Sequence, residues 1–127
     1  MSLTNIMNML TGGSNAVENI SASSAVQFHG DKDTIFIDVR SHGEVQMSGT
    51  IKGALVVPLN ELNAHAKPDG SGKFPAANEN KRIILVCASG ARSGSAARQL
   101  AGMGYENAAN LSGGIGAWHR AGGAMGR

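Results

Sequence analysis

The chain has 127 residues, 42% of them hydrophobic, and eleven Lys and Arg against nine Asp and Glu leave a formal net charge of +2. This length suits one domain, and the small charge and scattered basic residues argue against a dedicated nucleic-acid binder. The sequence has no apolar run of the roughly 18 residues that a membrane helix needs, and its single cysteine excludes an internal disulfide. We therefore expect a protein of the reducing cytoplasm with no membrane partner; the periplasm is the alternative if a signal peptide has been removed.

The first residues differ in composition from the rest. Residues 1–19 mix Asn, Ser, Thr and Gly with scattered Met and Leu, and they lack the charged start and long apolar block of a signal peptide. We predict an N-terminal arm over residues 1–19, in part disordered, followed by one domain over residues 20–127.

Regular elements are predicted from the start of this domain. Ser21 is a good N-cap for a short helix that a glycine ends. The run DTIFIDVR at 33–40 is almost continuously apolar, as in a strand buried on both faces of a parallel sheet. A second strand is expected over 54–57, a helix over 60–66, and an exposed loop over 67–81.

The second half repeats the alternation of strand and helix. RIILVC at 82–87 is a buried strand, a helix follows over 91–104, a short strand lies within 106–114, and a last helix covers 113–123. This order predicts a three-layer α/β fold with a mainly parallel central sheet flanked by helices. Ligands of such sheets bind beyond the carboxyl ends of the strands, which is where Cys87 lies.

Small residues and an arginine follow this cysteine. The small residues between Cys87 and Arg92 let the backbone curl so that the amides of residues 88–93 form a nest for an anion. The helix that begins near Arg92 adds the positive end of its dipole. Besides Arg92, the residues expected to bind the substrate through this nest are Ala88, Ser89, Gly90, Ala91 and Ser93. A thiol there should ionise readily, so we predict that Cys87 is a nucleophilic thiolate, which must be open to its substrate. The alternative is a small apolar core residue.

Three segments resemble one known family. CASGARS at 87–93 is similar to the active-site loop of rhodanese-like sulfurtransferases, a Cys-x-x-Gly-x-Arg-Ser/Thr run. IDVRSHGEVQMSGTIKGALVVPL at 37–59 and LSGGIGAW at 111–118 resemble two further segments of the family. They occur in the family's order, and the likeness spans about residues 20–120. The resemblance implies a single rhodanese domain.

The same resemblance implies a reaction. Cys87 would take the outer sulfur of a small anionic donor such as thiosulfate and hold it as a persulfide, with no other cofactor, and cyanide or a thiol would then accept the sulfur. One thiol suffices for this chemistry. The alternative is a carrier or regulatory module that receives a persulfide from a protein partner in a sulfur relay and has little activity with thiosulfate.

Supporting roles are expected for five residues around the thiol. Arg92 would bind the anionic donor or stabilise the loop. Asp38, at the end of a buried strand, is expected in a hydrogen-bonding role near the pocket, and Arg40 in a structural ion pair with Glu44. Ser93 is either a hydroxyl donor or an ordinary residue of the first helical turn.

Other chemistry is less favoured. The loop is Cys-x4-Arg, one residue shorter than the Cys-x5-Arg loop of dual-specificity phosphatases, and an arsenate reductase would need a resolving cysteine. No metal site is expected, because the histidines have no ligand spacing with one another or with the cysteine: His29, His42, His65 and His119. By resemblance the SGGIG turn at 112–116 caps the pocket, and Trp118 is expected to pack in the core.

Overall fold

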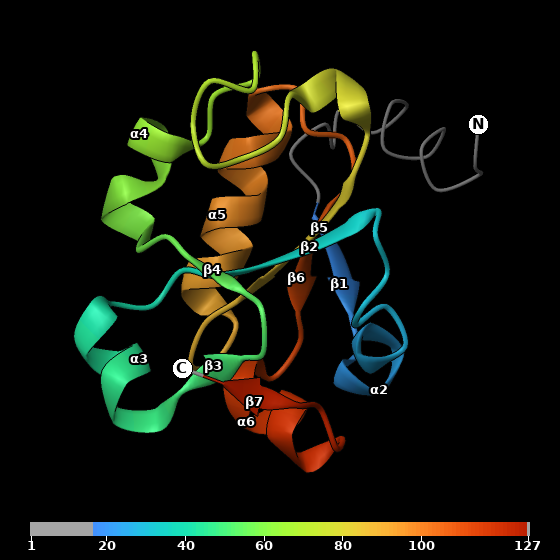
Figure 1. Ribbon diagram of the computed structural model, residues 1–127, viewed down its shortest axis with the longest axis vertical. Helices are drawn as coiled ribbons and strands as arrows, with labels where there is room; N and C mark the ends of the chain where they lie inside the picture. The colour runs from blue at the N-terminus through green and yellow to red at the C-terminus, as the bar shows by residue number, and fades with distance from the viewer. Residues whose placement is uncertain (1–16, 127) are drawn as a thin grey trace.

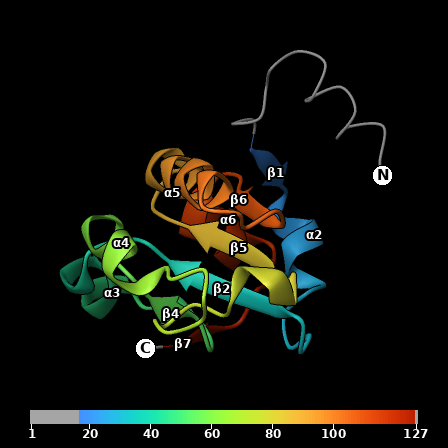
Figure 2. The same cartoon turned by 90° about the horizontal axis from the view of Figure 1, so that it is seen from above.

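The computed structural model describes residues 17–126, and the centre of the fold is a parallel sheet. In the described chain its strands run in the order β1-β6-β5-β2-β4, and each is parallel to its neighbours (Figure 2). These strands are β1 (Glu18–Ile20), β2 (Thr34–Asp38), β4 (Leu55–Val56), β5 (Arg82–Val86) and β6 (Ala108–Leu111). A separate antiparallel pair consists of β3 (Thr50–Ile51) and β7 (Met125–Gly126).

Helices cover both faces of the sheet (Figure 1). They are α2 (Ala22–Val26), α3 (His42–Ser48), α4 (Leu62–His65), α5 (Ala91–Gly102) and α6 (Gly114–Arg120), with short 3-10 turns η1 (Leu59–Glu61) and η2 (Ala77–Glu79). Successive residues of β2 and β5 face opposite sides, so Ile37 and Leu85 pack with α4 and α5 while Phe36 and Ile84 pack with α2 and α6. The predicted three-layer α/β fold with a mainly parallel sheet is confirmed.

The predicted N-terminal arm needs one correction. Glu18 and Asn19, which we placed in the arm, belong to β1 and pair with Ala109 and Asn110 of β6. The strand has only three residues, two of them exposed and polar, so its backbone pairing leaves no hydrophobic pattern in the sequence. The rest of the arm, residues 1–16, lies outside the described residues.

Helix α3 lies where the sequence predicted no helix. Its N-terminus carries a capping box: the hydroxyl of Ser41 accepts the Glu44 amide at 3.2 Å, and Glu44 Oε1 accepts the Ser41 amide at 3.1 Å. The spacing Ser-x-x-Glu is a known signal for a helix start, and it was missed because only Val45 of this helix is buried. The two-residue strands β3 and β7 were missed as well.

The sheet register brings several residues of the site together at the carboxyl ends of the strands. Asp38 pairs with Val86, and Leu85 pairs with Asn110, so Asp38, Cys87 and Asn110 all lie near the carboxyl ends of adjacent strands. Parallel sheets place their sites at this edge. Within residues 17–126, no helix has the length and apolarity to cross a membrane.

Candidate active site

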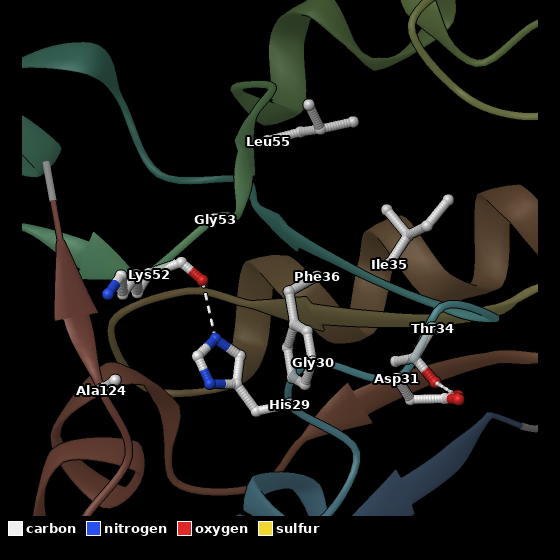
Figure 3. A pocket seen from close by; sticks show the side chains of 10 residues that line it. All are labelled: His29, Gly30, Asp31, Thr34, Ile35, Phe36, Lys52, Gly53, Leu55 and Ala124. Carbon is white, nitrogen blue, oxygen red and sulfur yellow. Dashed lines mark hydrogen bonds between the residues drawn. The ribbon is translucent and has the colours of Figure 1, made fainter.

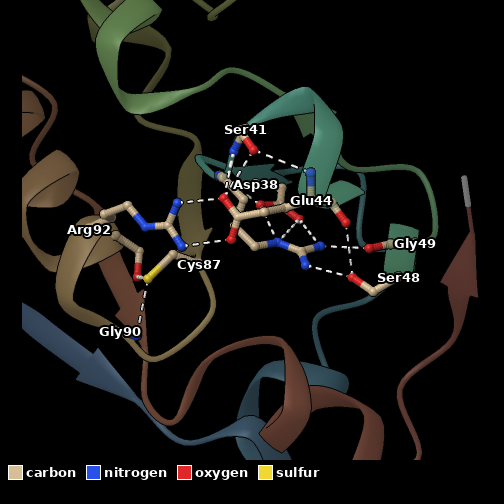
Figure 4. Close-up of polar contacts among 10 residues, drawn as sticks. Asp38, Ser41, Glu44, Ser48, Gly49, Cys87, Gly90 and Arg92 are labelled. Carbon is tan, nitrogen blue, oxygen red and sulfur yellow. Dashed lines mark hydrogen bonds and ion pairs between the residues drawn. The ribbon is translucent and has the colours of Figure 1, made fainter. Parts of the chain in front are cut away.

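Cys87 lies between the end of β5 and the start of α5. Gly90 is the N-cap of α5 with φ at 109°, a conformation that favours glycine, and it turns the chain sharply into the helix. The turn directs the Gly90 amide at the sulfur, to which it donates at 3.0 Å, while the Ser93 hydroxyl lies 3.3 Å from Sγ (Figure 4). The loop and the first helical turn thus gather hydrogen-bond donors around one sulfur atom.

These donors decide the ionisation of the thiol. Burial raises the pKa of Cys87, but hydrogen bonds from the Ser93 hydroxyl and from the amides of Ser93, Gly90 and Ser89 outweigh burial and lower the pKa below its ordinary value. This direction is the one that we expect of a nucleophilic thiol, whose role as a nucleophile stays a prediction. Roles for the amides of Ala88 and Ala91 stay predictions.

The exposure of the thiol differs from our expectation. Cys87 is 1% exposed, whereas a nucleophile open to its substrate was predicted. The first turn of α6 packs against the loop: the Ile115 amide donates to the Cys87 carbonyl at 2.9 Å, and the Gly114 backbone lies so close to the Cys87 and Ala88 carbonyls that a Cβ there would overlap them. A substrate therefore reaches the sulfur only after a local movement. The SGGIG turn does lie against the loop.

Arg92 is the loop arginine, and its partner is a carboxylate of this same chain. Arg92 Nη1 and Nη2 donate to Glu44 Oε1 and Oε2 at 2.7 and 2.9 Å (Figure 4). The Arg92 guanidinium, together with the Ser41 amide, lowers the pKa of Glu44 to about 2, and Glu44 in turn raises the pKa of Arg92. The position next to Cys87 agrees with an anion-binding arginine, but Glu44 holds it in this structure.

The predicted ion pair between Arg40 and Glu44 is wrong. Arg40 Nη2 donates instead to Asp38 Oδ2 at 2.7 Å, and both side chains are buried, at 3% and 0% exposure. Thr50 Oγ1 donates to the same carboxylate at 2.7 Å, and Arg40 also bonds the Gly49 carbonyl. Arg40 pairs with Asp38 because Asp38 lies only two residues away in the sequence and because a buried carboxylate needs a charged partner. The pair ties β2 to the end of α3.

Two contributions to the site were missed. Glu44 was assigned to Arg40, although the capping box gave a signal for its helix. Asn110 was not considered, yet its Oδ1 accepts the Ser93 hydroxyl at 2.5 Å. The only sequence signal for Asn110 was its position near the end of a short predicted strand, which pairs with β5 in the structure. Trp118 is fully buried, as predicted for a packing residue.

A surface hollow lies away from the cysteine loop, beside strand β2. His29, Phe36 and Lys52 are among the residues that line it, and His29 Nε2 lies 2.7 Å from the Lys52 carbonyl oxygen (Figure 3). Of the described residues, those from Cys87 to Ser93 do not line it. The hollow is therefore separate from the cysteine loop.

Comparisons with known proteins identify the family of the chain. The model of the rhodanese-like domain matches residues 21–121. A sulfurtransferase of Allochromatium vinosum is 34% identical over 107 residues, which cover 84% of this chain and 92% of that protein. The structure of the human single-domain sulfurtransferase is similar with a TM-score of 0.66 and 26% identity, over 83% of this chain and 97% of that one. A Rhodopseudomonas palustris protein of unknown function, described as a possible tyrosine phosphatase, has a TM-score of 0.76 and 28% identity, over 95% and 93%. The chain therefore belongs to the rhodanese-like domain family and resembles its single-domain sulfurtransferases.

Proposed function

We propose that the protein is a thiosulfate:acceptor sulfurtransferase that works through a persulfide on Cys87. One observation carries this proposal: the only cysteine of the chain lies at the end of β5, where the Gly90 amide and the Ser93 hydroxyl surround its sulfur. The lowered pKa of Cys87 supports a thiolate nucleophile. The kinship with proteins named sulfurtransferases supports the reaction class.

The reaction has two transfers at sulfur. The Cys87 thiolate attacks the outer sulfur of thiosulfate, a new S–S bond forms, and the bond to the sulfonate sulfur breaks so that sulfite leaves with the electron pair. Cyanide then attacks the terminal sulfur of the persulfide, thiocyanate leaves, and the thiolate returns. A thiolate acceptor would follow the same course and carry the sulfur away as its own persulfide.

The loop supplies charge stabilisation in both steps. The Gly90 amide, which donates to the resting sulfur, and the positive end of α5 would stabilise a terminal sulfur anion. Arg92, once released from Glu44, would bind the sulfonate oxygens of the donor through its planar fork. A local movement around the thiol must come first, since Cys87 is 1% exposed in this structure.

The direct test is thiocyanate production. The purified protein incubated with thiosulfate and cyanide should form thiocyanate, and thiosulfate alone should add about 32 Da, the mass of one sulfur, to the chain. Cys87→Ala should remove both signals, whereas the control Ser95→Ala, on α5 away from the sulfur, should keep them. A wild-type protein without product, or equal product from Cys87→Ala, would refute the proposal.

A second candidate is a sulfur carrier that receives its persulfide from a protein partner. The observation that favours it is the ion pair between Arg92 and Glu44, which neutralises the arginine that would otherwise bind a small anionic donor. On this reading a persulfidated protein donor adds sulfur to Cys87 and thiosulfate does not. Mass spectrometry with both donors separates the two candidates.

Phosphate ester hydrolysis is the third activity to test. The loop has four residues between Cys87 and Arg92, one fewer than the loop of dual-specificity phosphatases. We expect no release of nitrophenol from p-nitrophenyl phosphate. Hydrolysis that depends on Cys87 would instead place the protein with the phosphatases.

A further inference from the structure

The hydroxyl of Ser93 has two acceptors and one hydrogen. It lies 2.5 Å from Asn110 Oδ1 and 3.3 Å from Cys87 Sγ, and Ser93 is fully buried. A hydroxyl donates one hydrogen bond at a time. The shorter contact is to Asn110, so the hydrogen lies with the amide oxygen for most of the time and with the sulfur for the rest, while the Gly90 amide donates to the sulfur at 3.0 Å.

The orientation of Asn110 is held from its other side. Asn110 Nδ2 donates to Asn19 Oδ1 at 3.0 Å, which turns Oδ1 toward Ser93. Asn110 is 9% exposed, whereas Asn19 is exposed on β1. The chain of contacts therefore runs from the protein surface at Asn19 through Asn110 and Ser93 to the sulfur.

We propose that Asn110 is a positioning residue that withholds the Ser93 hydroxyl hydrogen from the Cys87 sulfur and so sets how readily the thiol ionises. The inference rests on Cys87 being the nucleophile of the proposed function. While the hydrogen lies on Asn110, the neutral thiol is favoured; when it turns to Sγ, it stabilises the thiolate, because hydrogen bonds to ions are the stronger ones. The proposal involves no covalent change, because only the direction of one hydrogen bond differs between the two arrangements.

The charged groups around the sulfur stay in place when Asn110 is changed. Arg92 on α5 faces Cys87, and the carboxylates of Glu44 and Asp38 face Arg92, with Arg40 bonded to Asp38. The strand β6 has no charged residue, and α6 carries its charges in the last turn. A change in the pKa of Cys87 on substitution of Asn110 can thus be distinguished from an effect of these ion pairs.

The test measures alkylation of the free protein. Because the chain has one cysteine, the rate of reaction with iodoacetamide between about pH 5 and about pH 10 gives the apparent pKa of Cys87 alone. The variants are Asn110→Ala, Asn110→Asp and Asn19→Ala, each also in a Ser93→Ala background, with circular dichroism to verify folding. Asn110→Asp keeps the size of the side chain, and Asn19 is exposed, so these two variants retain the test if Asn110→Ala does not fold.

Opposite shifts are expected from one position. Asn110→Ala and Asn19→Ala should release the hydrogen to the sulfur and lower the midpoint by on the order of one pH unit. Asn110→Asp should raise it, because the carboxylate is an acceptor only and also brings a negative charge near the sulfur. In the Ser93→Ala background the shifts of the two Ala variants should shrink, whereas Asn110→Asp should keep the part of its shift that its own charge causes. Unchanged midpoints, shifts of one sign for Ala and Asp at position 110, or shifts of full size for the two Ala variants without the Ser93 hydroxyl overturn the inference. No sulfur donor takes part, so the result is independent of whether thiosulfate is a substrate.

Discussion

The guanidinium of Arg92 and the carboxylate of Glu44 form a bidentate ion pair, with N–O distances of 2.7 and 2.9 Å. The partners come from α5 and α3 and are 48 residues apart in the sequence. The resting protein thus holds an anion of its own against the loop arginine. Under the proposed function, an anionic donor would compete with this carboxylate for Arg92.

Glu44→Gln should improve the binding of an anionic donor. The amide keeps an oxygen for the capping box with Ser41 but no longer neutralises Arg92. Both partners are partly exposed, at 39% and 38% of their side chains, so we expect a decrease of about fivefold or less in the KM for thiosulfate, with a smaller change in kcat. Steady-state kinetics measure this, with exposed Glu106→Gln as the control. An unchanged or higher KM would mean that Arg92 does not bind the donor.

The same ion pair predicts how stability depends on pH. The folded-state pKa of Glu44, about 2, is below its ordinary value of 4.5, so the pair stabilises the fold above about pH 4.5 and loses that contribution as the pH falls toward 2. The difference in Tm between wild type and Glu44→Gln should be constant near neutrality and shrink in acid. A difference that grows on acidification would contradict the assignment.

Ser93→Ala should raise the pKa of Cys87, because the Ser93 hydroxyl contributes to lowering it against the effect of burial. Sulfur transfer at neutral pH should fall, and activity should return as the pH is raised and the thiol ionises. The pH profile of kcat/KM measures this shift. Loss of activity that no rise in pH restores would show that the hydroxyl acts in some other way.

Continuous apolar runs made much of this fold predictable. Strands β2 and β5 are buried on both faces, and the small residues after Cys87 indicated a tight loop before any contact was known. Helix α3 buries only Val45 and so has no hydrophobic period, which left its capping box as the only signal. Its omission led directly to the wrong partner for Glu44.

The tertiary contacts of the site were beyond the sequence. Ser93 and Asn110 meet because β6 pairs with β5 in a register that only the folded sheet defines. The burial of Cys87 likewise depends on how closely Gly114 approaches the loop. Composition and spacing carry no record of such contacts.

Arg40→Ala should destabilise the fold by about 3–5 kcal/mol, because it leaves the Asp38 carboxylate buried without its charged partner. Arg40→Lys should restore little, since lysine cannot form the same fork of bonds to Asp38 and Gly49. Urea unfolding measures both changes. The matched control is Lys32→Ala, which removes an exposed ion pair and should leave the midpoint unchanged. If Arg40→Ala and Lys32→Ala changed the unfolding midpoint equally, the buried pair of Arg40 and Asp38 would have no special role in stability.

Gly114→Ala should impair activity through the backbone alone. Gly114 has φ at 72°, and a Cβ there would overlap the carbonyl oxygens of Ala88 and Cys87, so the cysteine loop or α6 has to move. We expect a large loss of sulfur transfer and faster alkylation of Cys87 as the first turn of α6 moves away from the loop. Gly102→Ala is the control, because its Cβ would meet open space at the end of α5 and should leave both rates unchanged. If Gly114→Ala kept wild-type transfer and alkylation rates, the close approach of α6 would have no part in enclosing the thiol.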